Sequence, residues 1–227
     1  MRIAIIGTGR MGRTLAALAT EKGHTIVAQV ARPSESFWDS LTAEVVIDFS
    51  HASQVPSILK HALAHRIPLI TGTTGWYEDL PALRSRAATQ IGTRWLWGGN
   101  FSRGIALLKV AIRSIVTLWD AFTDWEALLI ETHHRHKKDA PSGTAIELAK
   151  AFPAEKAIQS LRVGEVVGEH TLLLSGPGEE VSLLHRAHDR RIFAEGALWA
   201  AEWLLRQSHF VGSFEEALLS GLNQQPG

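Results

Sequence analysis

The sequence has no cysteine among its 227 residues. Disulfides, thiolate catalysis and iron–sulfur ligation are therefore excluded, and the absence is compatible with a cytoplasmic protein. An excess of charge of one sign is also missing, because 23 Lys and Arg residues balance 23 Asp and Glu residues. This balance gives no support to a nucleic-acid-binding role or to binding of an acidic membrane.

Long uninterrupted hydrophobic runs are absent as well. The most apolar predicted helix, Gly104–Phe122, contains Lys109 and Arg113, so it lacks the pattern of a membrane span. The chain enters a strand pattern at once, without the layout of a signal peptide. The sequence therefore favours a globular protein outside the membrane, with one large domain or two small ones at roughly 100–200 residues each.

The N-terminal stretch has the pattern strand, glycine-rich turn, helix, strand. Arg2–Ile6 is an apolar run typical of a buried parallel strand, and Thr25–Val30 is the next predicted strand. Glycines in a G-x-G-x-x-G turn permit tight turning, approach of the backbone to a pyrophosphate and close helix–strand packing. We interpret the turn as a dinucleotide-binding loop, the alternative being a turn that binds nothing; it comprises Gly7, Thr8, Gly9, Arg10, Met11 and Gly12.

The end of the second strand bears on the choice of cofactor. An acidic residue is expected there to hold the ribose hydroxyls of NAD, but Ala31 and Arg32 occupy the position. Because an arginine can accommodate the 2′-phosphate of NADP, the sequence predicts NADPH and/or NADH, with a lean towards NADPH. Glu35 lies close enough to keep NADH open, and Arg32 could be only a solvated loop charge.

Strands and helices continue to alternate, which predicts a parallel α/β sheet. Ligands of such sheets bind at the carboxyl ends of the strands. The expected strands are Glu44–Asp48, Ile67–Ile70 and Thr93–Trp97, with helices at Ala52–His65 and Glu78–Thr89 and a short loop at Pro33–Thr42. The predicted cofactor contacts after the last two strands are Gly72, Thr73, Thr74, Gly98, Gly99, Asn100 and Phe101.

The segment Glu131–Ala145, E-T-H-H-R-H-K-K-D-A-P-S-G-T-A, holds the densest polar cluster. It lies between a predicted strand, Trp125–Ile130, and a predicted helix, Ala145–Phe152, where an α/β scaffold commonly positions its chemistry. Two adjacent histidines supply a proton donor with an unperturbed pKa of about 6.5. A histidine-rich surface loop is the alternative. No metal site is predicted, because the H-E-x-x-H spacing and a cysteine partner are missing.

The start of that last helix is a predicted anion site. Ser142 is a good N-cap, and Pro141 fixes the backbone just before it. The N–H groups of Gly143 and Thr144, with the Thr144 hydroxyl, lie at the positive end of the helix and predict binding of a carboxylate or phosphate. The chemistry implied is proton delivery to an anionic substrate.

Further β-type segments with Gly and Pro turns suggest an open, mixed sheet in the second half. An open sheet has to be covered, so oligomerisation is expected through this domain. The segments are Arg162–Val166, His170–Ser175 and Val181–Arg186, followed by closing helices at Arg191–Gln207 and Phe214–Leu222.

Five motifs resemble those of the 4-hydroxy-tetrahydrodipicolinate reductase family, also called dihydrodipicolinate reductase. They are G-R-M-G at Gly9–Gly12, D-F-S at Asp48–Ser50, G-T-T-G at Gly72–Gly75, N-F-S at Asn100–Ser102 and the whole segment Glu131–Ala145. Their order and spacing cover nearly the whole chain, and the last motif is highly specific.

The resemblance implies an N-terminal Rossmann-like cofactor domain at 1–101 and 192–227. It implies a C-terminal α+β domain at 102–191 that binds substrate and assembles a homotetramer. NAD(P)H would reduce 4-hydroxy-tetrahydrodipicolinate, a small dicarboxylate, in lysine and diaminopimelate biosynthesis. The proton-transfer roles fall on His133 and Lys137. The substrate contacts fall on His134, Ser142, Gly143, Thr144 and Thr74.

The chain departs from the family pattern at its first glycine loop, where G-T-G-R-M-G is one residue shorter than G-x-x-G-R-M-G, and at Ala31, where many members have an acid. Two rival functions stay open. One is reduction of another small amino or imino acid by a Rossmann enzyme. The other is nucleotide sensing without turnover, although a sensor needs no proton donor.

Overall fold

The chain, described by a computed structural model at residues 1–152 and 158–222, divides into two compact units. One comprises Met1–Phe101 with Phe193–Gly227, and the other Ser102–Ile192. The predicted cofactor domain ran to residue 227, and its last residues, 223–227, lie outside the described part.

The first unit is built on six parallel strands in the order β10-β5-β4-β3-β1-β2. The central strands are apolar on both faces, and every residue from Ile3 to Ile6 and from Val45 to Ile47 is fully buried. Such two-sided burial is typical of a parallel sheet covered by helices on both faces. The strands are β1 (Arg2–Ile6), β2 (Thr25–Val30), β3 (Val45–Asp48), β4 (Leu69–Thr71), β5 (Arg94–Trp97) and β10 (Phe210–Ser213).

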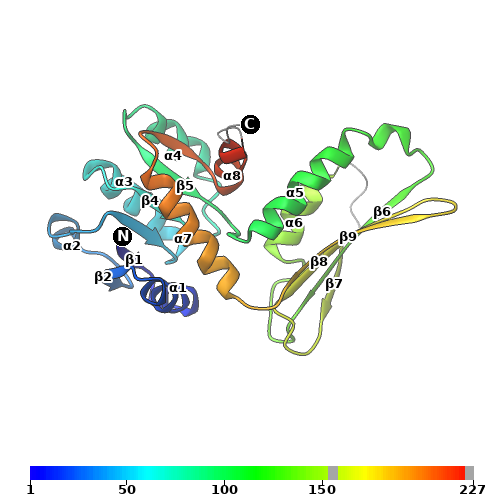
Figure 1. Cartoon of the computed structure of the whole chain (residues 1–227), viewed down its shortest axis with the longest axis horizontal. Coiled ribbons are helices and arrows are strands. Elements are labelled where there is room, and N and C mark those ends of the chain that lie inside the picture. Colours follow the sequence, from blue (N-terminus) through cyan, green and yellow to red (C-terminus); the bar gives the residue numbers. More distant parts are fainter. Residues whose placement is uncertain (153–157, 223–227) are drawn as a thin grey trace. The chain divides into compact units, whose positions relative to one another are not determined.

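Helices of the first unit come from both ends of the chain, and the C-terminal α7 and α8 (orange and red in Figure 1) return to it. Gly196 of α7 fits against Phe101, because an added Cβ would lie 1.7 Å from the Phe101 carbonyl oxygen. The helices are α1 (Arg10–Glu21), α2 (Glu35–Asp39), η1 (Ala52–Gln54), α3 (Val55–Ala64), α4 (Leu80–Ala88), α7 (Arg191–Leu205) and α8 (Phe214–Leu222).

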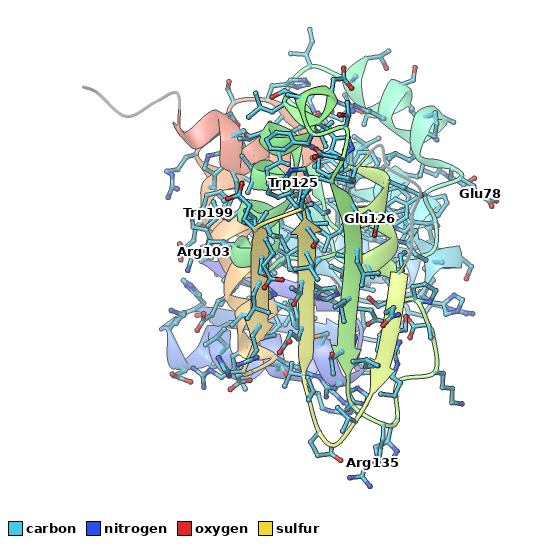
Figure 2. The ribbon with its side chains drawn as sticks, turned by 90° about the vertical axis from the view of Figure 1, so that its right-hand side faces the viewer. Glu78, Arg103, Trp125, Glu126, Arg135 and Trp199 are labelled. Carbon is cyan, nitrogen blue, oxygen red and sulfur yellow. The ribbon has the colours of Figure 1, made fainter. Side chains whose placement is uncertain are left out.

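The second unit is a four-stranded mixed sheet in the order β7-β6-β8-β9, with two helices on one face. Its core joins Ile112 of α5 and Leu148 of α6 to Leu129 and Leu172 of the sheet. Figure 2 looks onto the opposite sheet face. The elements are α5 (Arg103–Val116), η2 (Trp119–Ala121), β6 (Glu126–His133), α6 (Gly143–Lys150), β7 (Ile158–Arg162), β8 (Gly168–Ser175) and β9 (Glu180–Ala187).

The predicted α/β class is confirmed, but three predicted elements of the first 122 residues need correction. The expected loop Pro33–Thr42 contains α2, because the Ser34 hydroxyl caps it at the Phe37 N–H and Trp38 is only 2% exposed. The expected helix Gly104–Phe122 ends at Val116 and continues as the 3-10 turn η2. The expected fourth strand is shifted to Leu69–Thr71, since it pairs with β3 only there.

Two predicted strands of the second unit are also misplaced. Strand β6 does not stop at Ile130 but runs to His133, because its ladder with β7 continues to the pair His133–Arg162. Strand β7 occupies Ile158–Arg162 rather than 162–166, and the chain turns after it at Gly164, which has φ +53°. In the first unit, the sequence did not predict strand β10, which pairs with β5.

Membrane-spanning character was searched for in the part of the chain that the structure describes. None of its helices combines the length and the apolar character needed to cross a bilayer.

Candidate active site

The carboxyl ends of β1, β3, β4 and β5 lie along one edge of the parallel sheet, and backbone hydrogen bonds join the turns that follow them. Phe49 N–H donates to the Ile6 carbonyl at 2.7 Å. Gly72 N–H donates to the Asp48 carbonyl at 2.8 Å, and Gly98 N–H donates to the Thr71 carbonyl at 3.0 Å. The predicted cofactor segments, widely separated in sequence, therefore form one continuous edge.

The glycine loop turns tightly and leaves open space before helix α1. Gly7 has φ +124°, a conformation that favours glycine. A Cβ at Gly12 would lie 2.1 Å from the Gly7 carbonyl oxygen, so α1 packs directly on the turn. A Cβ at Gly9 meets no atom within 4 Å, and no side chain caps α1. Open space and a helix N-terminus thus coincide, which suits an anion.

The remaining predicted cofactor residues differ in their exposure. Thr8, Arg10, Thr74 and Gly99 are exposed, and Met11, Gly72 and Asn100 are partly exposed. Thr73, Gly98 and Phe101 are buried instead. The Phe101 ring packs 4.9 Å from the Phe214 ring, measured between centroids. These three buried residues therefore support the edge of the sheet and are not exposed on its surface.

Arg32 lies exposed just after β2, as its predicted contact with a 2′-phosphate requires. Its rival Glu35 belongs to α2, and the Glu35 carboxylate lies 3.5 Å from Nε2 of His61 on α3. The Glu35 side chain is 81% exposed, so both Arg32 and Glu35 present their charges to solvent near the end of β2.

In the second unit, His133 ends strand β6 and is only 8% exposed. Its Nδ1–H donates to Oε2 of Glu131, two residues earlier on the same face of the strand. The other oxygen, Oε1, accepts from Nη2 of Arg162 at 2.8 Å and from the backbone N–H of Ser142 at 3.3 Å. The fully buried carboxylate therefore connects the histidine to β7 and to the start of α6.

Burial and pairing set the protonation of this cluster. Burial lowers the pKa of His133 below its ordinary value, and the charge of Glu131 only partly offsets that effect. Burial raises the pKa of Glu131, but the hydrogen bond from Arg162 and the neighbouring positive charges outweigh it and leave the pKa lowered. Burial lowers the pKa of His170 to about 4, so this ring is neutral at pH 7.

The predicted anion turn has the expected N-cap. The Ser142 hydroxyl accepts from the Ala145 N–H at 3.2 Å, and the same oxygen lies 3.3 Å from Nε2 of His170. Gly143 is exposed, and a Cβ there would meet nothing within 4 Å. The backbone at the positive end of α6 is therefore open to a guest, with partly exposed Thr144 beside it.

Lys137 and His134 lie on the loop between β6 and α6. The ammonium of Lys137 contacts both carboxylate oxygens of Asp139, at 2.8 and 2.9 Å. Partial burial and the charge of Arg190 lower the pKa of His134. The second unit thus contains His133, His134, Lys137 and the α6 turn, whereas Thr74, another predicted substrate contact, belongs to the first unit.

Comparison with known families covers nearly the whole chain. The family described as "Dihydrodipicolinate reductase, N-terminus" matches residues 1–101, and "Dihydrodipicolinate reductase, C-terminus" matches residues 104–218. The chain belongs to the dihydrodipicolinate reductase family.

Relatives of this family support the assignment. A 4-hydroxy-tetrahydrodipicolinate reductase of Xanthomonas campestris is 39% identical over 87% of this chain and 89% of its own length. One of Natronomonas pharaonis is 35% identical over 96% of this chain and all of its own length. A dipicolinate-bound dihydrodipicolinate reductase from Paenisporosarcina has the same fold, with a TM-score of 0.74 at 22% identity, covering 95% of this chain and 98% of that one.

Three polar residues of this cluster, of which Glu131 and His170 are buried and Arg162 is partly exposed, were given no role by sequence reasoning. Glu131 was placed in the motif without a function, although an acid two residues before His133 in a strand shares its face. Arg162 and His170 come from other strands, β7 and β8, and no local spacing could connect them to His133.

Glu131, His133 and His170 also have ligand atoms within 4.8 Å of one another, close enough to hold a metal ion. However, the carboxylate already accepts from three donors, one of them the guanidinium of Arg162. A cation would have to displace this positive charge. The donor set therefore fits a hydrogen-bonded network better than a metal centre.

Proposed function

We propose that this chain reduces 4-hydroxy-tetrahydrodipicolinate to tetrahydrodipicolinate, with loss of water, in lysine and diaminopimelate biosynthesis. The reductant is a nicotinamide nucleotide, which supplies the hydride when bound. Because the reaction consumes NAD(P)H, we place it in the cytoplasm.

One observation of the second unit carries the proposal. The same buried carboxylate of Glu131 accepts from His133 and from the backbone N–H of Ser142, the N-cap of α6. A proton-transfer group and an anion-binding turn are therefore held together by a single side chain. A dicarboxylate that must be protonated needs both features in one place.

The residues divide the work as follows. The N–H groups at Gly143 and Thr144 bind one substrate carboxylate at the positive end of α6, and His134 contacts the substrate. His133 and Lys137 hold the protons that are exchanged with the substrate. Asp139 keeps the Lys137 ammonium in place until a substrate carboxylate competes for it.

The first unit serves as the cofactor domain. Gly7–Gly12 holds the pyrophosphate, and the edge formed by Gly72–Thr74 and Gly98–Phe101 borders the rest of the nucleotide. Arg32 favours NADPH, because its exposed guanidinium can pair with a 2′-phosphate and no acid stands at the end of β2 to hold the ribose hydroxyls.

The second unit serves as the substrate and assembly domain of a homotetramer. The sheet face opposite α5 and α6 is the surface seen in Figure 2. Leu161 of β7 and Leu184 of β9 are 49% and 53% exposed there. An open sheet face that exposes apolar side chains requires a cover, and a second copy of the same face provides one.

A coupled assay tests the reaction. Dihydrodipicolinate synthase generates the unstable substrate from pyruvate and aspartate semialdehyde, and oxidation of NADPH and of NADH is followed separately after addition of this protein. We expect oxidation that depends on the synthase and is faster with NADPH. Cofactor binding without synthase-dependent oxidation would instead support nucleotide sensing or a different imino substrate.

The Lys137→Ala variant tests the assignment of the proton donor. Loss of a general acid typically lowers turnover about 10²–10⁴-fold. Lys138→Ala is the matched control, because Lys138 is the adjacent exposed lysine of the same loop and has no assigned role. Nearly full turnover of Lys137→Ala would contradict the role given to Lys137.

A further inference from the structure

The buried carboxylate of Glu131 costs the fold free energy that a leucine would not. An ionised carboxylate loses its hydration on burial, and the penalty in real proteins is several kcal/mol even before pairing is counted. Leu129, two residues earlier on the same strand face, shows that this face accepts an apolar side chain. The role of Glu131 therefore lies in what it does to its neighbours.

Its first effect is on the ring of His133. Because Nδ1–H donates to the carboxylate, the neutral ring carries its proton on Nδ1 and leaves Nε2 to exchange a proton with a substrate. Gly168 borders that nitrogen, and a Cβ there would lie 3.1 Å from Nε2. The glycine therefore leaves room beside the nitrogen that has to react.

Its second effect is on the anion turn. The Ser142 N–H donates to the same carboxylate, and Ser142 in turn caps α6 through its hydroxyl. The guanidinium of Arg162 is 2.8 Å from Oε1 and keeps the carboxylate ionised. Movement of Glu131 would disturb the histidine and the turn together.

We propose that Glu131 is the positioning residue of this site, fixing the Nδ1–H tautomer of His133 and holding Nε2 in register with the carboxylate-binding turn at Ser142. The inference rests on the proposed reductase function for its kinetic consequence. The tautomer itself can be measured whether or not the protein turns over that substrate.

Glu131→Gln is the decisive variant, since it keeps the shape and removes the charge. The amide oxygen can still accept from Arg162 and Ser142, which turns the amide NH2 towards His133. Nδ1 then has to accept, so the proton moves to Nε2. We expect kcat to fall about 10²–10⁴-fold, the contribution of general acid–base catalysis. Loss of the correct histidine tautomer lowers kcat about 10⁴-fold in a serine-protease triad. The Kd of dipicolinate should change less than about threefold, because the turn stays paired.

Glu147→Gln provides the matched control in the same unit. Glu147 pairs with the nearly buried Lys109 at 2.6 Å and has no contact with the histidine. The same chemical change there should leave kcat near that of the unmodified protein. Equal losses of kcat in the two variants would show a general structural effect of removing a paired carboxylate, and would overturn the positioning role.

Nitrogen-15 NMR of histidine-labelled protein gives a second readout at pH 8. His133 is neutral there because its pKa lies below the ordinary value. Among the 11 histidines, its signals are identified by their loss in His133→Ala. We expect a protonated Nδ1 in the unmodified protein and a protonated Nε2 in Glu131→Gln. A protonated Nε2 in the unmodified protein would overturn the inference even if the variant failed to fold, whereas an inactive protein with the expected tautomer would overturn only the reductase function.

Discussion

Alanine substitutions at Gly9 and Gly12 are expected to have opposite effects on stability and cofactor binding, although both glycines belong to the same loop. At Gly9 an added methyl group meets no atom within 4 Å, whereas at Gly12 it would lie 2.1 Å from the Gly7 carbonyl oxygen. Gly9→Ala therefore changes only what a bound cofactor encounters. Gly12→Ala changes the protein itself.

The expected magnitudes follow from these contacts. Gly9 has φ −73°, so alanine fits without strain. The gain of about 0.4–1 kcal/mol from a stiffer unfolded chain is offset by a weaker N-cap of similar size. Gly12 lies inside α1, where alanine gains about 1 kcal/mol of helix propensity, but overpacking costs typically 1–3 kcal/mol and more against backbone. We expect Gly12→Ala to lower Tm by roughly 2–8 °C and Gly9→Ala to leave it nearly unchanged.

Thermal unfolding and cofactor titration together test this reasoning. Gly9→Ala should weaken NADPH binding about tenfold or more, about 1.4 kcal/mol, because the methyl group occupies the space of the pyrophosphate. Titration by quenching of tryptophan fluorescence measures the affinity at 25 °C, where both variants are folded. A Gly9→Ala protein that binds NADPH as tightly as the unmodified one would refute the assignment of this loop to the pyrophosphate.

Three further predictions concern charge and assembly. Arg32→Asp should lower kcat/KM for NADPH by roughly 10–100-fold and change that for NADH much less, in the two-cofactor assay, because the new charge repels a 2′-phosphate. Burial raises the pKa of Asp48, so its ionised form costs stability at neutral pH, and Asp48→Asn should raise Tm at pH 7. The rise in Tm caused by Asp48→Asn should be complete above the raised pKa and should disappear as the pH falls towards the ordinary value of 3.8. Measurement of Tm for both proteins over this pH range tests the prediction. Leu184→Asp should reduce the mass found by light scattering below that of a tetramer, whereas Leu107→Asp, at a 70% exposed leucine of α5, should not.

The parallel sheet was predictable because its strands are short apolar runs that end in turn residues. Ile3–Ile6 and Val45–Ile47 are buried on both faces, so nothing in their sequence competes with the strand pattern. Helix α2 was missed because it is too short and too polar to show a clear pattern. Its five residues carry one buried anchor, Trp38, and two charges, and no helical period can be recognised over so short a stretch.

Strands β6 and β7 show what local patterns leave out. The polar run after Ile130 suggested a loop, yet Glu131 and His133 continue the strand because β7 pairs with both residues and β8 pairs with Glu131. The position of β7 itself is set by that pairing, which begins at Ile158. Long-range backbone hydrogen bonds therefore decided both boundaries, and these bonds are invisible to a reading of neighbours in sequence.

For the candidate site, the sequence showed which polar residues lie together in one segment but not how they are connected in the fold. A run of histidines and lysines before an S-G-T helix start indicates proton transfer to a bound anion, because histidine can exchange protons near neutral pH and a helix N-terminus binds anions. A prediction from sequence assumes that charged residues are exposed to solvent, because burial of an isolated charge costs too much free energy. Glu131 escapes that rule because His133, Arg162 and Ser142 each donate a hydrogen bond to it. The three donors come from β6, β7 and the start of α6. Their shared hydrogen bonds to one buried carboxylate therefore fix these elements relative to one another and give the polar segment a single geometry.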